Sequence, residues 1–62
     1  MGSALTPAEA EVVKYLRETA LSHKQIAHER GCVKKTVDAL AYRAYQKLGV
    51  HSRMELILER QT

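Results

Sequence analysis

Residues 31–49, GCVKKTVDALAYRAYQKLG, predict one helix set between two glycines. On a helical wheel the larger apolar side chains cluster on one face, which we expect to be buried. They are Val37, Leu40, Ala41, Ala44 and Leu48. The opposite face carries Lys35, Ala39, Tyr42 and Gln46, with Asp38 and Arg43 at its margins. The stretch therefore predicts one buried stripe and one stripe that is presented to the surroundings.

The two ends of this helix differ. Gly49 can adopt the left-handed conformation that closes a helix. At the other end Val33 occupies the N-cap position and has no side-chain oxygen, which leaves backbone donors near Lys35 and Thr36 without a side-chain partner. Exposed donors beside two lysines suit an anion such as a backbone phosphate. The alternative is that water satisfies them.

Capping signals predict three further helices. Thr6 with Glu9, Ser22 with Gln25 and Ser52 with Glu55 form capping boxes, and a proline follows Thr6. The first helix runs to about Thr19, the second ends at Gly31, and the last continues through MELILER. Strand-like alternation is absent from the sequence, so we expect an all-α domain of four helices over residues 4–62. Met1, Gly2 and Ser3 look like a remnant of an expression vector.

In the last helix we expect Met54, Ile57 and Leu58 to pack on the core. That arrangement leaves Leu56 on the opposite side, beside Arg60.

Charge is concentrated in the second half of the chain. Residues 1–33 hold four basic and four acidic residues, whereas residues 34–62 hold six basic and three acidic ones, so the whole net charge of +3 lies there. Such an excess on one helix predicts a polyanionic partner, although a solvated helix face is the alternative. No apolar run reaches the length of a membrane span. The single cysteine, Cys32, fits a reducing compartment such as the cytoplasm.

Other chemistry has little support in the sequence. His23, His28 and Cys32 are close in sequence, but their spacing matches no familiar metal-ligand pattern. Cys32 paired with a histidine lacks an orienting acid and a pocket for a substrate. We therefore expect no metal, no cofactor and no enzymatic activity.

Four motifs together resemble one protein family. LTPAEAEVVKYL, LSHKQIA, KKTV and KLGVHSR, between Leu5 and about Leu58, are similar to the LuxR/GerE-type helix-turn-helix DNA-binding domain of bacterial transcription regulators. The resemblance implies a four-helix domain whose second and third helices form the helix-turn-helix. It also implies that the third helix enters the major groove of double-stranded DNA and that the fourth helix commonly mediates dimerisation. RNA polymerase is a further expected partner.

The resemblance and the outer face of the helix from residue 34 together predict the site. The expected phosphate contacts are Lys24, Lys34, Lys35, Thr36, Arg43 and Gln46. The expected base-facing residues are Lys35, Asp38, Ala39 and Tyr42. A homodimer on DNA is expected to use Leu56 and Arg60.

The chain departs from the family pattern in two instructive places. The stretch RETALSHK is one residue longer than usual and lacks the usual glycine, so either the first helix extends or the turn bulges. Asp38 puts a carboxylate where duplex DNA approaches. It either accepts a hydrogen bond from a cytosine or repels duplexes that offer no compensating contact. A domain that has lost DNA binding and serves as a protein-interaction module is the alternative function.

Overall fold

The computed structural model describes the backbone of residues 4–60 and the side chains of residues 4–58. This part of the chain holds four helices and no strand: α1 (Pro7–Glu18), α2 (His23–Arg30), α3 (Lys34–Leu48) and α4 (Arg53–Arg60). The predicted all-α architecture is confirmed. The presumed vector remnant, Met1 to Ser3, lies outside the described residues.

The capping boxes predicted for the first two helices form as expected. The backbone N–H of Glu9 donates to Thr6 Oγ1 over 3.2 Å, and the Glu9 carboxylate accepts from the Thr6 N–H over 3.0 Å. Ser22 and Gln25 repeat the exchange at 3.2 and 2.8 Å. At α4 the Glu55 carboxylate instead accepts from the His51 N–H, over 3.3 Å, while Ser52 Oγ accepts from the Glu55 N–H.

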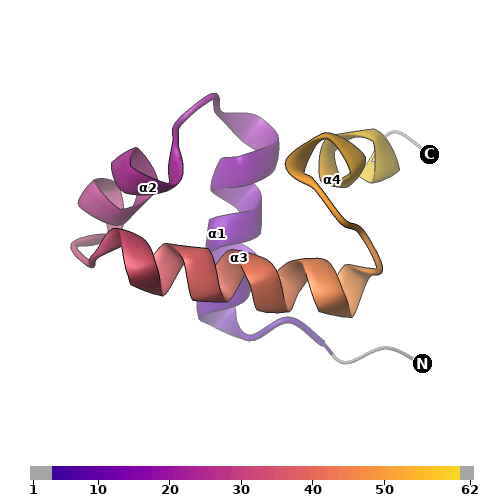
Figure 1. Cartoon of the computed structure of the whole chain (residues 1–62), viewed down its shortest axis with the longest axis horizontal. Helices are drawn as coiled ribbons and strands as arrows, with labels where there is room; N and C mark the ends of the chain where they lie inside the picture. Colours follow the sequence, from indigo (N-terminus) through magenta and orange to yellow (C-terminus); the bar gives the residue numbers. More distant parts are fainter. Residues whose placement is uncertain (1–3, 61–62) are drawn as a thin grey trace.

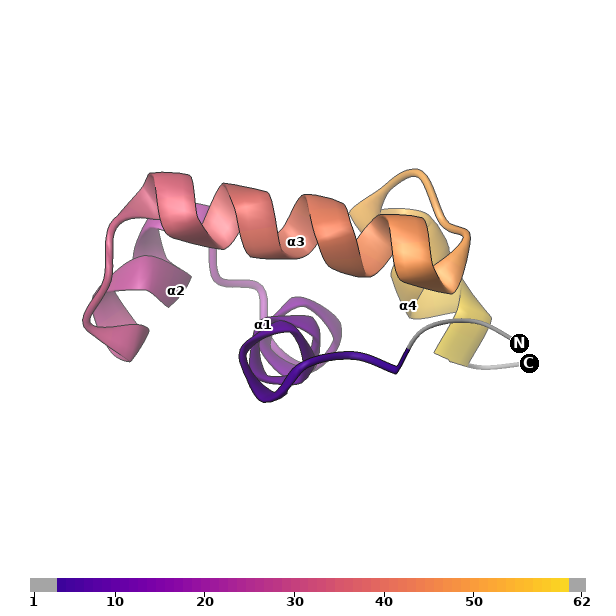
Figure 2. The same ribbon diagram turned by 90° about the horizontal axis from the view of Figure 1, so that it is seen from below.

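α3 is the central helix of the domain. It packs against α1 and α2, and α4 packs against α1. Figure 1 shows α3 running across α1 with α2 and α4 near its two ends, and Figure 2 shows α3 along one side of the other helices. One long face of α3 is therefore turned away from the rest of the domain.

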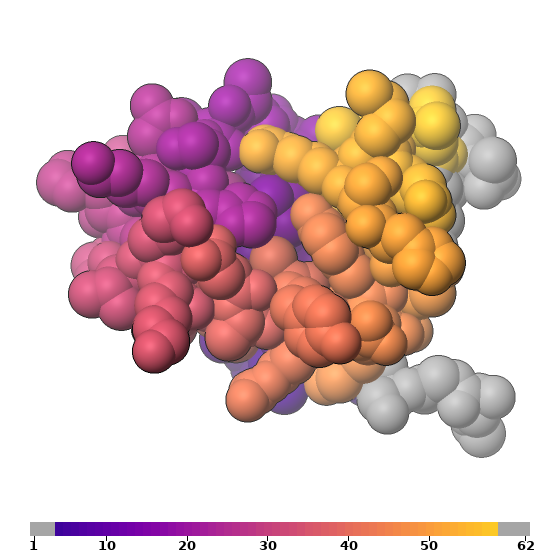
Figure 3. All heavy atoms as spheres, in the orientation of Figure 1, coloured from indigo at the N-terminus to yellow at the C-terminus, as the bar shows by residue number. Residues whose placement is uncertain are grey.

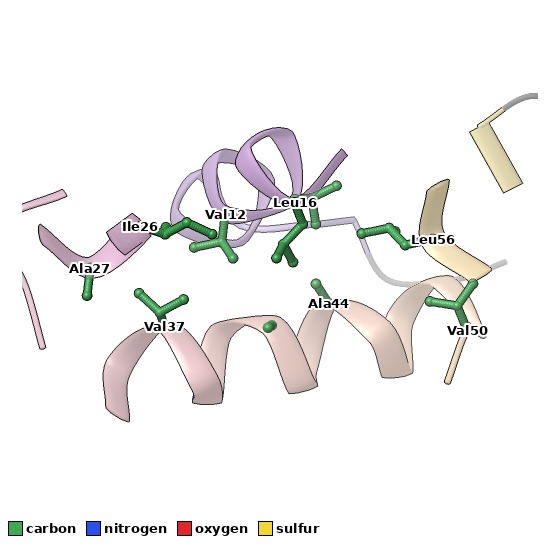
Figure 4. Packing of buried hydrophobic residues seen from close by; sticks show 10 residues of the cluster. Val12, Leu16, Ile26, Ala27, Val37, Ala44, Val50 and Leu56 are labelled. Carbon is green, nitrogen blue, oxygen red and sulfur yellow. The ribbon is translucent and has the colours of Figure 1, made fainter. Parts of the chain in front are cut away.

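One hydrophobic cluster lies between these helices (Figure 4). Its buried members are Val12, Val13, Leu16, Ile26, Ala27, Val37, Ala41, Ala44, Val50 and Leu56. The predicted core stripe of α3 is confirmed, because Val37, Ala41 and Ala44 are buried and both leucines of the stripe pack against the cluster.

The glycine-free connection between α1 and α2 is closed by side chains. α1 ends at Glu18, and Thr19 takes extended backbone angles while its hydroxyl donates to the Tyr15 carbonyl over 2.7 Å. The guanidinium of Arg53 donates to the carbonyls of Leu16, Thr19 and Leu21 at 3.0, 2.6 and 2.6 Å. α1 is therefore not extended, and Arg53 from α4 satisfies backbone carbonyls at the end of α1 and in the connection to α2.

The predicted orientation of α4 is wrong. Leu56 is fully buried, at 0 % exposure, whereas Met54 and Leu58 are 64 % and 53 % exposed. In Figure 4 the Leu56 side chain points from α4 toward the cluster. Because α4 is short and apolar on several sides, periodicity could not choose its buried face. Packing around Leu56 and the reach of Arg53 to α1 decide it. Leu56 is thus unavailable as a dimer contact, and the Arg60 side chain lies outside the described residues.

Candidate nucleic-acid interface

The outer stripe of α3 is uncovered. Lys35, Ala39, Tyr42, Arg43 and Gln46 are all exposed, and Tyr42 retains 65 % of its accessible surface. Figure 3 shows side chains of α3 across the near face of the molecule between α2 and α4. The face combines a small residue, Ala39, with hydrogen-bonding side chains on either side. A helix of this shape can approach the edges of base pairs closely.

The start of α3 is open, as the sequence predicts. Val33 has extended backbone angles and makes no side-chain cap. The Thr36 N–H nevertheless has a partner, since it donates to the Val33 carbonyl over 3.0 Å. The first turn therefore tightens, and the backbone donors that remain at this end are those of Lys34 and Lys35.

The four cations of α3 fall into two groups. Lys34 Nζ lies 2.9 Å from Asp38 Oδ2, and Lys47 Nζ lies 2.7 Å from Glu9 Oε1. Lys35 and Arg43 form no ion pair with any described residue and are exposed. Their charge is therefore not offset by a carboxylate of the domain, which suits them to phosphate binding.

Asp38 is bound on both of its oxygens. Its Oδ1 lies 2.6 Å from Nδ1 of His23, the first residue of α2, and its Oδ2 accepts from Lys34. The hydrogen bonds from His23 and then from Lys34 lower the pKa of the Asp38 carboxyl. Asp38 is therefore a carboxylate at neutral pH, and contacts with two other side chains set its direction.

α2 adds one exposed cation to this region. Lys24 follows His23 at the start of α2. The other end of α2 turns into α3 through Gly31, whose φ of 72° is left-handed, and the Cys32 N–H donates to the Ala27 carbonyl over 2.9 Å. Glycine adopts this backbone conformation without strain, because it has no Cβ. The turn joins α2 and α3 as a helix-turn-helix.

Sequence reasoning missed three polar contacts that shape the site. They are His23 with Asp38, Glu9 with Lys47, and Arg53 with the end of α1. Each contact joins residues at least 15 positions apart, so no local sequence pattern predicts it. His23, one of the three residues considered for a metal site, hydrogen-bonds Asp38 instead. Cys32 is half-buried against the core.

Comparisons with known proteins agree with this architecture. The family model GerE, described as bacterial regulatory proteins of the luxR family, matches residues 3–59. No curated protein and no solved structure matches the chain. Among the described residues, no helix has the length and apolar character needed to cross a membrane. Since the family match covers nearly the whole chain and the helices are those of a helix-turn-helix domain, the chain belongs to the luxR family of bacterial DNA-binding regulatory proteins.

Proposed function

We propose that this domain binds double-stranded DNA sequence-specifically, as part of a bacterial transcription regulator, with α3 in the major groove. The observation that carries the proposal is the outer stripe of α3, which is exposed along its length while the opposite stripe forms the core. Its position in a helix-turn-helix and the two unpaired cations, Lys35 and Arg43, support the same assignment. Such a regulator acts where the bacterial chromosome lies, in the cytoplasm.

We assign phosphate binding to the cations and polar groups around this stripe. Lys24, Lys35, Thr36, Arg43 and Gln46 are exposed, and the open backbone donors of Lys34 and Lys35 add an electropositive helix end. Lys34 reaches a phosphate only if it shares its charge with Asp38. Ala39 and Tyr42 are the proposed base-facing residues, together with Lys35. A phenol can also bond a phosphate, so Tyr42 serves either purpose.

A homodimer on DNA is the proposed assembly. The exposed apolar side chains of α4 support it, because Met54 and Leu58 leave more than half of their surface accessible. These two residues replace Leu56 as the expected contacts. Two copies of α3 would then read half-sites about one helical turn, roughly 10 bp, apart. RNA polymerase stays a prediction from the resemblance alone.

The salt dependence of duplex affinity tests the proposal. We expect log K to fall linearly with log salt, with a slope of about −0.9 for each phosphate contacted. The duplex is one selected by the wild-type chain from a random pool, with an unrelated duplex beside it. Tighter binding of the selected duplex establishes specificity. A flat salt response together with equal, weak binding of both duplexes would favour the protein-interaction module.

The variant Lys24→Ala tests whether Lys24 binds a phosphate. If Lys24 binds a phosphate, the variant should lose affinity for both duplexes and its salt slope should become shallower by about one. Lys14→Ala is the matched control, because Lys14 is an exposed lysine on α1. Its slope should equal that of the wild type. A loss confined to one base pair of the selected duplex would show instead that Lys24 contacts a base.

A further inference from the structure

Among the described residues, the polar side-chain contact that links the start of α2 to α3 is between His23 and Asp38. His23 is the first residue of α2, and its Nδ1 lies 2.6 Å from Oδ1 of Asp38 in the second turn of α3. A carboxylate only accepts hydrogen bonds, so Nδ1 carries the proton and donates. The bond is charge-assisted and only partly solvated, with 30 % and 42 % of the two side chains exposed.

Few side chains in the rest of α2 are buried. This helix has eight residues, and only Ile26 and Ala27 among them are buried. Its last residue, Arg30, pairs with Glu11 of α1 at 2.7 Å, and the turn at Gly31 joins it to α3 at the same end. The His23–Asp38 pair acts at the opposite end. The chain just before α2 is held to α4 and the core through Leu21, whose carbonyl accepts from Arg53 over 2.6 Å, whereas the His23–Asp38 pair links the first turn of α2 to α3.

We propose that Asp38 is a positioning residue of the DNA-binding unit, which holds the first turn of α2 against α3 through His23. Lys24 lies in that turn, so the pair sets the distance between the phosphate anchor on α2 and the exposed stripe of α3. Lys34 occupies the other carboxylate oxygen at 2.9 Å and completes the orientation of Asp38. The inference rests on the proposed DNA binding. It assigns to Asp38 neither base reading nor general repulsion of duplexes.

A double-mutant cycle tests this role. Affinities of His23→Ala, Asp38→Ala and the double variant are measured for the selected duplex and for a set of duplexes with single base-pair changes. We expect each single variant to lose about fivefold in affinity and the double variant to lose no more than either. The loss should be the same across the single base-pair changes. Glu11→Gln is the matched control, because it weakens an interhelical pair that does not involve α3. Its affinity should stay within about twofold of wild type.

A second measurement separates positioning from simple loss of structure. Nitrogen NMR shifts of the His23 ring in the free protein should show a protonated Nδ1 in the wild type and a mixture of tautomers in Asp38→Ala. Thermal unfolding of both variants is recorded beside it. We expect them to remain folded at the temperature of the binding assay, and the exchanged variant His23→Asp with Asp38→His to recover part of the lost affinity.

Three results would overturn the inference. Relaxed discrimination at one base pair in Asp38→Ala but not in His23→Ala would make Asp38 a base reader. Tighter binding of unrelated duplex by Asp38→Ala, with His23→Ala unchanged, would mean that Asp38 repels DNA. A wild-type His23 ring without a proton on Nδ1 would show that the pair does not form. If the wild-type chain bound no duplex, the proposed function would fail as well, whereas the first three results leave it standing.

Discussion

Val33 illustrates how one residue leaves a helix end open. Its backbone angles, φ −97° and ψ 157°, are those of an ordinary N-cap, but its side chain offers no acceptor and is 65 % exposed. The preceding caps, Thr6 and Ser22, hold the same extended conformation and do accept a backbone N–H. The position is thus shaped for a capping hydroxyl that the residue does not provide.

Val33→Ser should therefore stabilise the domain. A serine in this conformation can accept from the backbone of the first turn, and such caps contribute about 1 kcal/mol to the free energy of unfolding. Urea unfolding followed by circular dichroism measures the change. Val33→Ala is the control, because it shortens the exposed side chain without adding an acceptor. Equal stabilities of the serine and alanine variants would contradict a capping deficit at this position.

α4 shows that a short helix can be assigned correctly and still be oriented wrongly. Four of its residues between positions 54 and 58 are apolar, so more than one face could have been buried. Leu56 is the buried one because Arg53, three positions earlier, reaches back to three carbonyls at the end of α1. The anchoring of Arg53 fixes the rotation of the helix, and Met54 and Leu58 are left outside.

Leu58 and Leu56 of α4 should respond differently to substitution. Leu58→Asp should keep the free energy of unfolding within about 0.5 kcal/mol of wild type, because Leu58 is 53 % exposed. It should also reduce cooperative binding to a duplex with two half-sites. Leu56→Ala should instead cost about 2–5 kcal/mol of stability, since it removes a fully buried side chain. Cooperativity that survives Leu58→Asp would exclude this face of α4 as the dimer contact.

Among the described residues, the buried carboxylate of Glu9 joins the start of α1 to the end of α3. Glu9 in α1 is 3 % exposed at its side chain and lies 2.7 Å from Nζ of Lys47 in the last turn of α3. The bond from Lys47, followed by that from the Thr6 N–H, lowers the pKa of Glu9. A domain of this size buries a modest share of its surface, so a single buried ion pair affects its stability noticeably.

This pair predicts acid sensitivity. The Glu9 pKa is lower in the folded state than in the unfolded state. Its stabilising effect is therefore fully present above the ordinary glutamate value of about 4.3. The effect is lost as the pH falls through the lowered value. Glu9→Gln should therefore be less stable than wild type at pH 7, and the difference should shrink toward pH 3. Urea unfolding at both pH values measures this.

Glu11→Gln provides the control for the acid experiment. The Glu11 side chain is 51 % exposed in its pair with Arg30, so its removal should change stability little at either pH. A difference between Glu9→Gln and wild type that stayed constant from pH 7 to pH 3 would show that ionisation of Glu9 does not support the fold.

The four helices, most of their ends and the two faces of α3 could be predicted from the sequence. These features are local, because capping boxes act over three residues and the helical period sorts Val37, Ala41 and Ala44 from Lys35, Ala39 and Tyr42. The family motifs are local as well, so the class of protein could be predicted from them. The exposure of the candidate DNA-binding stripe followed from the same periodicity.

Which groups from distant parts of the chain meet could not be predicted from the sequence. The rotation of α4, the closure of the α1–α2 turn by Arg53, and the pairs His23–Asp38 and Glu9–Lys47 all depend on how the helices pack. Asp38 is the clearest case. On the wheel of α3 it was a lone acid at the margin of the outer face, and its partner on α2 is 15 residues away. Helical periodicity specifies the direction in which a side chain points from its own helix. The packing of the other helices determines which residues that side chain contacts.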